Sequence, residues 1–175
     1  MKNVMNKIPL LMALACMIIV SSCNKEDDEP MLRSQVFEYS FNDGQLVGPA
    51  TSYVGEHPRN LSARMEVMEM PNGMAKIMVT LNNTMAGQMY MIHAHDMADP
   101  DTTPNGTPYN ETPNANVLSE MVTPQGTTAM VEHLTMLTYD QLLQEYDGFL
   151  VVHDPTQPLS TTDLTTYLIL GVVAR

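Results

Sequence analysis

Two histidines spaced two residues apart are the feature of this sequence best suited to chemistry. His93 and His95 stand in Ile92-His93-Ala94-His95-Asp96, at the end of an apolar run. Successive side chains of a β-strand point to opposite faces, so two imidazoles at this spacing project from the same face. Neutral imidazole is a common metal ligand. The pair therefore indicates a metal site, and the alternative is two ordinary half-exposed histidines at a strand end.

His153 is the candidate third ligand. It follows Leu150-Val151-Val152 and so occupies the matching place at the end of a second apolar strand. Three imidazoles from two neighbouring strands suit one metal ion. We therefore expect His93, His95 and His153 to converge. Of the other histidines, His133 is expected at the edge of the core, as a secondary candidate at most, and His57 stands in a loop with no partner evident in the sequence.

Methionine is frequent, with 17 residues in the chain. Thioether sulfur is a soft ligand that suits Cu(I). Methionine is also an adaptable core filler, and this chain has no Trp and only 3 Phe. Because most of the methionines fall on alternating strand positions, we expect most of them in the core. Met89, Met91 and Met97, close to the histidine pair, are the exceptions, and Met91 and Met97 are candidate secondary ligands.

Alternating apolar residues predict the strands that must position these side chains. Residues 64–70, 74–81 and 87–95 alternate, with a turn signal at Pro71-Asn72-Gly73. Further strand signals cover residues 127–136, 149–153 and 165–174. Ala75, Ile77, Val79 and Leu81 should share one face of their strand, and Tyr90, Ile92 and Ala94 should lie opposite the histidine pair.

Two other segments interrupt the strands. Residues 96–116 are crowded with Asp, Pro, Thr, Asn and Gly and predict a long loop beside the histidines. Thr138 and Gln141 have the spacing of a helix capping box, which predicts one or two helical turns through Tyr146. The pattern as a whole predicts an all-β, Greek-key β-sandwich of about seven to eight antiparallel strands with one short helix.

The N-terminus has the pattern of a targeting segment. Lys2 and Lys7 precede an apolar stretch at residues 8–20, and Val20-Ser21-Ser22-Cys23 looks like a bacterial lipobox. We expect residues 1–22 to be a lipoprotein signal peptide, residues 23–35 a flexible tether lipidated at Cys23, and residues 36–175 the folded domain. The alternative is an ordinary secretory signal cleaved near Ser22.

Composition narrows the classes of function. The net charge is −12, and removal of Lys2 and Lys7 with the signal makes it −14. An acidic chain without a basic patch argues against nucleic acid and against electrostatic docking on anionic lipid. Membrane attachment should therefore come from lipid on Cys23. Cys16 would be lost with the signal, so no disulfide or thiolate metal site is expected.

The acidic run at residues 24–30 resembles the surface-export tethers of Bacteroidota lipoproteins, with a plain spacer as the alternative. We expect a cell-envelope protein in the outer membrane, on either its periplasmic or its surface-exposed face. The sequence does not name a protein partner or an oligomeric state.

Parts of the chain resemble a known domain. Residues 73–95, ending in Tyr90-Met91-Ile92-His93-Ala94-His95, look like the first half of a CHRD (chordin-type) domain. Residues 137–143 and 147–153 look like the second half in bacterial envelope lipoproteins. The resemblance covers residues 61–175. CHRD domains are similar in layout to Cu/Zn superoxide dismutases, which implies that His93, His95 and His153 match copper ligands of that family.

The chain also departs from the dismutase pattern. The resemblance places a metal-bridging His in the long loop, where this chain has Thr107-Pro108-Tyr109-Asn110, so Tyr109 is only a secondary site candidate and no zinc site is recognised. The substrate-steering Arg would fall near Tyr167, and no Arg lies between Arg64 and Arg175. Leu170, in Leu170-Gly171-Val172-Val173, stands where a disulfide Cys is expected.

Three hypotheses follow from these observations. The first is a lipid-anchored envelope protein that binds one copper ion through His93, His95 and His153 for storage, delivery or sequestration. The second is a copper-only superoxide dismutase-type redox enzyme that uses the same ligands. The third is a metal-free extracellular binding module of the CHRD type.

Overall fold

The computed structural model describes residues 31–174. The lipobox and Cys23 lie outside the described residues. Eight strands alternate with short turns and loops, and the first strand begins at Ser34, within the last residues of the segment expected as a tether. The strands are β1 (Ser34–Tyr39), β2 (Ser62–Glu69), β3 (Met74–Asn82), β4 (Tyr90–Asp96), β5 (Ser119–Val122), β6 (Thr128–Thr138), β7 (Gly148–His153) and β8 (Tyr167–Val172).

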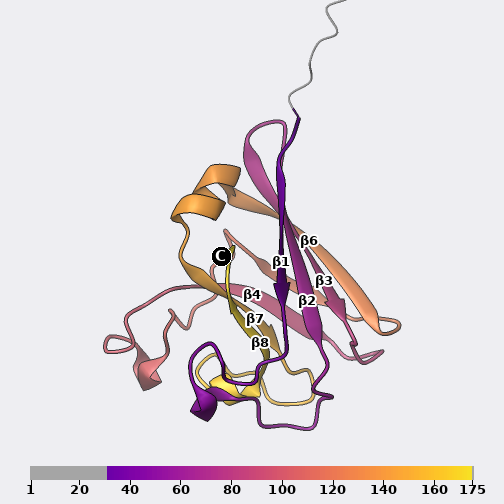
Figure 1. The fold of residues 1–175 in the computed structure, drawn as a ribbon. Helices are drawn as coiled ribbons and strands as arrows, with labels where there is room; N and C mark the ends of the chain where they lie inside the picture. Colours follow the sequence, from indigo (N-terminus) through magenta and orange to yellow (C-terminus); the bar gives the residue numbers. More distant parts are fainter. Residues whose placement is uncertain (1–30, 175) are drawn as a thin grey trace, which may run out of the picture.

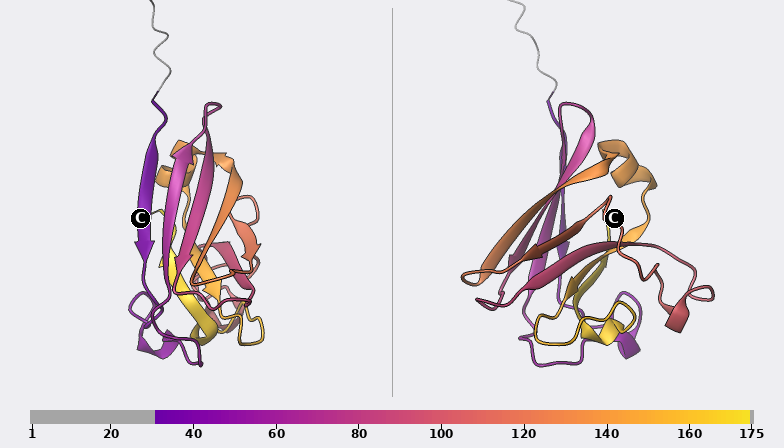
Figure 2. Two further views of the ribbon diagram at one scale, coloured as in Figure 1. Left: turned by 90° about the vertical axis from the view of Figure 1, so that its right-hand side faces the viewer. Right: turned by 180° about the vertical axis from the view of Figure 1, so that it is seen from behind.

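The strands form two antiparallel sheets packed as a sandwich (Figures 1 and 2). The first sheet has the order β1-β2-β3-β6 and the second has the order β5-β4-β7-β8. The chain therefore passes from β3 to β4 into the second sheet, returns at β6 to pair with β3, and crosses again so that β7 pairs with β4. This connectivity is a Greek key, and it confirms the predicted fold class.

The core lies between the two sheets. Ala75, Ile77, Val79 and Leu81 of β3 are each fully buried, as the alternation predicted. Tyr90, Ile92 and Ala94 of β4 belong to the same core cluster. Because strand side chains alternate, the intervening residues of β4 project from the outer face of the second sheet.

That outer face of the second sheet is covered as well. All six residues of β7, from Gly148 to His153, are buried. A second apolar cluster lies on the outer face, formed by Tyr109, Phe149, Val151, Tyr167 and Leu170. A strand buried on both faces reads as a continuous apolar run, and Phe149-Leu150-Val151-Val152 is one.

The cover comes mainly from the loop between β4 and β5. It projects to one side of the sandwich, on the left in Figure 1 and on the right in the rear view of Figure 2. It contains the short 3-10 turn η2 (Pro104–Gly106), and a single β-bridge between Met97 and Tyr109 holds it near the end of β4. Other 3-10 turns are η1 (Pro49–Thr51) and η4 (Leu164–Thr166).

The predicted helix is present at the predicted place. Thr138 and Gln141 form a reciprocal capping box: the Thr138 N–H donates to Gln141 Oε1 at 3.0 Å, and the Gln141 N–H donates to Thr138 Oγ1 at 3.2 Å. The turn that follows, η3 (Gln141–Glu145), has π-helical hydrogen bonding. Within residues 31–174, no helix is long and apolar enough to cross a membrane.

The structure corrects two details of the sequence analysis. The expectation that most methionines fill the core is wrong: of those in residues 31–174, Met65 alone is buried, whereas Met130 and Met136 are 56% and 69% exposed. On β3 and β6, Met78 and Met130 occupy outward positions, whereas the inward positions next to them hold Ile77, Val79, Ala129 and Val131. The prediction also omitted β1 and β5, both of which lie at sheet edges.

Candidate metal site

His93 and His95 lie on the outer face of the second sheet. Both stand on β4, and their cross-strand partners on β7 are Val151 and Phe149. His153 ends β7 on the same face, after a register irregularity between Val152 and His153 that pairs His153 with Tyr167 of β8. The two strands are adjacent in the sheet, so three imidazoles far apart in sequence become neighbours.

The three rings converge as the sequence predicted. The ring centroids of His93 and His95 are 6.0 Å apart, and those of His93 and His153 are 5.2 Å apart. One nitrogen from each ring lies within 4.8 Å of the others. Nitrogens that each lie about 2 Å from one ion are within about 4 Å of each other. A pair of ring nitrogens separated by as much as 4.8 Å would therefore have to move closer together for all three to bind the same ion.

Each ring presents a buried nitrogen that has no hydrogen-bond partner within residues 31–174. These atoms are His93 Nδ1, His95 Nε2 and His153 Nε2. At His95 the tautomer is set from the other side of the ring, because Nδ1 lies 2.9 Å from the carbonyl oxygen of Asn110. A carbonyl only accepts, so Nδ1 carries the proton and Nε2 keeps a free lone pair.

Burial keeps these imidazoles neutral. Desolvation lowers the pKa of His93 to about 4, with a further contribution from the neighbouring His95. Desolvation, together with repulsion from His93 and His95, lowers the pKa of His153 to about 3. The pKa of His95 is also lowered, chiefly by burial, although the Asn110 carbonyl and Asp96 oppose the shift. Neutral imidazole is the form that binds a metal ion.

Aromatic side chains hold the rings in place. The Tyr109 ring, from the long loop, lies 4.9 Å from the His95 ring, and the Tyr167 ring lies 4.8 Å from the His153 ring. The hydroxyl groups of Tyr109 and Tyr167 are 2.8 Å apart. Burial raises the pKa of Tyr109 to about 12. Both tyrosines are therefore neutral phenols at pH 7 that wall the site without adding charge.

The carboxylates next to the histidines in sequence, Asp154 and Asp96, accept hydrogen bonds from other side chains. Asp154, next to His153, accepts hydrogen bonds from Tyr53 and from Gln157, the latter at 2.8 Å. Asp96, next to His95, accepts from Asn114 Nδ2 at 2.7 Å. The donor set that converges is therefore three neutral nitrogens. Imidazole donors suit zinc, copper, iron and nickel, so the residues present could hold an ion of any of these metals.

The secondary candidates lie at different distances from the three histidines. Tyr109 contacts the site, as described above. Met91 lines a surface pocket together with His153. Met97 is 45% exposed and is joined to Tyr109 by the β-bridge. His133 is not part of the group, because its Nδ1 lies 2.8 Å from Glu120 Oε1 and its Nε2 lies 3.1 Å from the Ala115 carbonyl oxygen.

His57 differs from the sequence-based description of a loop histidine without a partner. It is 2% exposed, and its Nε2 lies 2.8 Å from the hydroxyl group of Tyr90. Its backbone N–H donates to the Tyr53 hydroxyl at 2.9 Å, and that hydroxyl donates to Asp154. His57 thus ties the segment after η1 to β4. The partners are 4 and 33 residues away, and no local pattern marks the contact with Tyr90.

Sequence reasoning missed the aromatic wall of the site. The sequence marks Tyr167 only as a position without the arginine that the resemblance implies, and Phe149 only as part of a strand. A signal was present in the continuous apolar run of β7, which indicates a covered outer face. Comparison of the chain with protein-family models, with curated proteins and with solved structures finds no match. The site's geometry and chemistry therefore carry the functional argument.

Proposed function

We propose that this chain is a lipid-anchored cell-envelope protein that binds one copper ion through His93, His95 and His153, for storage, delivery or sequestration. In this proposal the domain is of the CHRD type, with a layout similar to that of Cu/Zn superoxide dismutases. Lipid on Cys23 would attach it to the outer membrane.

The observation that carries the proposal is the convergence of three buried histidines, each of which also has a ring nitrogen without a hydrogen-bond partner in the described part of the chain. A buried polar atom left unpaired costs about 1–3 kcal/mol. Such atoms are few in folded proteins, so three at one place need an explanation. A bound cation would accept all three lone pairs and remove this cost.

The kind of ion follows from the donor set and its surroundings. Three imidazoles bind Cu(II) more tightly than the other divalent first-row metals, in the general order of affinities. Met89 and Met91 lie in the pocket that adjoins His153, and thioethers favour Cu(I). Imidazole nitrogens beside thioether sulfurs therefore suit copper, which occurs as both Cu(I) and Cu(II).

Holding copper is favoured over superoxide dismutation because no cation of residues 31–174 is positioned to attract an anionic substrate. Arg33 pairs with Glu69 and Asp140, Arg64 pairs with Glu66, and Lys76 pairs with Glu132. Arg59 donates to the backbone carbonyl of Tyr53 at 2.9 Å and stacks near Phe41. The remaining charge is strongly acidic, which repels superoxide.

Two measurements on the purified protein test the proposal. Metal analysis after copper loading and removal of loosely bound ions should give one copper per chain, and the absence of retained copper would favour a metal-free binding module. A superoxide-decay assay on the loaded protein should show no acceleration beyond an equal amount of chelated copper. Rapid decay would instead favour the redox enzyme.

A further inference from the structure

Three methionines lie beside the histidines on the same face of the second sheet. Met91 stands two residues before His93 on β4, so its side chain also points away from the core. Its cross-strand partner on β5 is Met121, and directly opposed residues have Cβ atoms about 4.5–5.5 Å apart. Met89 precedes Met91 by two residues and lines the same pocket. We call Met89, Met91 and Met121 the methionine cluster.

A pocket lies between two methionines of this cluster and His153. It has a volume of about 170 Å³, and its walls include Met89, Met91 and His153. His153 is only 4% exposed, so the pocket gives access to a side chain that is otherwise covered. Two methionines of the cluster and His153 therefore share one surface pocket.

The sulfur atoms of Met89 and Met91 are the soft donors in this pocket, and Met121 lies opposite Met91 on β5. Met89 is 51% exposed and Met121 is 60% exposed, so neither side chain is used to fill the core. The one carboxylate in the pocket wall, Asp154, is occupied by Tyr53, Gln157 and Thr156. Hard cations prefer oxygen ligands, whereas thioethers select Cu(I).

We propose that the methionine cluster is a second binding site for a soft monovalent cation, Cu(I), and that it passes the ion through the pocket to His153. The transfer, but not the binding, rests on the proposed function of the histidines. The step is a ligand exchange: a thioether–copper bond breaks as a bond from His153 Nε2 to copper forms. Copper stays in the +1 state, and no proton or electron is exchanged.

Binding is tested with Ag(I), a soft monovalent probe that does not undergo redox chemistry, on the full chain labelled with ¹³C at the methionine methyl groups. Methyl signals of the methionine cluster should shift at lower Ag(I) concentration than those of Met130 and Met136, two exposed methionines of the first sheet. The shifts should persist in His153→Gln. The proposal would be overturned if the methyl signals of the methionine cluster needed as much Ag(I) to shift as those of Met130 and Met136.

Transfer is tested by the rate at which Cu(I) reaches the histidines from a chelate under anaerobic, reducing conditions. The variant M89L/M91L/M121L should fill the histidine site about tenfold more slowly, with unchanged final occupancy. M78L/M130L/M136L is the matched control and should behave as wild type. Equal rates in the two variants would contradict the transfer step. Methionine shifts without any histidine shift would overturn the proposed function and leave the methionine site standing.

Discussion

The tautomer of His95 shows how a single contact prepares a residue for its role. The Nδ1–H of His95 donates a hydrogen bond to the Asn110 carbonyl at 2.9 Å, which leaves the lone pair of Nε2 free. Metal-binding histidines commonly donate their other ring N–H to a carbonyl or carboxylate, and this fixes the tautomer and ring orientation. The long loop therefore positions the proposed ligand His95 as well as covering it, because Asn110 belongs to that loop.

Replacing His95 tests its role as a ligand. His95→Gln should lower copper affinity more than about 100-fold, the upper range for the loss of a supporting outer-shell group. The measurement is competition with a chelator of known affinity. His133→Gln is the control, because His133 bonds Glu120 and Ala115 outside the group and its replacement should leave copper affinity unchanged. His57 is unsuitable as a control, since it is buried and hydrogen-bonded. Equal affinities for the two variants would show that His95 is not a ligand.

The buried histidines also predict a pH dependence of stability in the metal-free protein. The pKa of His93 is about 4 when folded and 6.5 in the unfolded chain. Below pH 6.5 the unfolded chain binds a proton that the folded chain rejects, so the free energy of unfolding falls as the pH drops from 6.5 towards 4. The full effect for His93 is on the order of 3 kcal/mol.

Urea unfolding at pH 7.5 and pH 4.5 measures this effect. His93→Gln removes the titrating group, so its stability should fall less over that interval than that of the wild type. His153 contributes in the same direction, because burial and its neighbours lower its pKa to about 3. A wild-type stability that is constant or rises on acidification would mean that these histidines are accessible to protons in the folded state.

At the scale of elements, strand alternation explains both what was predictable and what was not. The inward row of β3 could be read directly from Ala75, Ile77, Val79 and Leu81. Edge strands gave a weaker signal: β5 has four residues, with Met121 exposed. In β1 the aromatic residue Phe37 packs on the core while Val36 is 41% exposed, which blurs the alternation.

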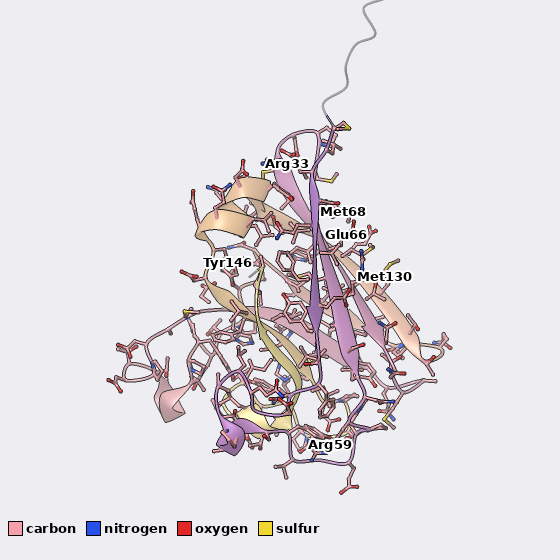
Figure 3. The ribbon with its side chains drawn as sticks, in the orientation of Figure 1. Arg33, Arg59, Glu66, Met68, Met130 and Tyr146 are labelled. Carbon is pink, nitrogen blue, oxygen red and sulfur yellow. The ribbon has the colours of Figure 1, made fainter. Side chains whose placement is uncertain are left out.

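Substitutions on the first sheet test the division between core and surface. Ile77 is fully buried on β3, so Ile77→Ala should lower the free energy of unfolding by about 2–5 kcal/mol. Met130 on β6 is 56% exposed, and Met130→Ala should change it by less than about 0.5 kcal/mol. Figure 3 marks Met130 and Met68 on this sheet. Chemical denaturation measures the free energy of unfolding of both variants. A large decrease for Met130→Ala would mean that the outer face of the first sheet is covered by another molecule.

At the scale of the whole molecule, the sandwich brings together residues that sequence alone leaves unrelated. His93 and His153 are sixty positions apart, and only the pairing of β4 with β7 makes them neighbours. The sequence predicts that His93 and His153 converge because each stands near the end of an apolar strand. The covering aromatic wall could not be derived, because Tyr109 reaches the sheet from a loop whose path has no periodicity. The contact between His57 and Tyr90 was unpredictable for the same reason.

The N-terminal prediction concerns how the whole molecule is held in the cell envelope. Cys23 in Val20-Ser21-Ser22-Cys23 is the expected acylation site. Cys23→Ala should therefore shift the protein from the membrane fraction to the soluble fraction, since no other segment is expected to anchor it. Fractionation with metabolic labelling by a fatty acid measures both properties. Labelled, membrane-bound Cys23→Ala protein would contradict the prediction.

The central claim is that one copper ion binds where three imidazoles converge. Anomalous diffraction at the copper absorption edge, from crystals of copper-loaded protein, tests it most directly. A single strong peak should lie about 2 Å from His93 Nδ1, His95 Nε2 and His153 Nε2. A fully loaded crystal with no peak among these atoms, or with its copper elsewhere on the molecule, would contradict the claim.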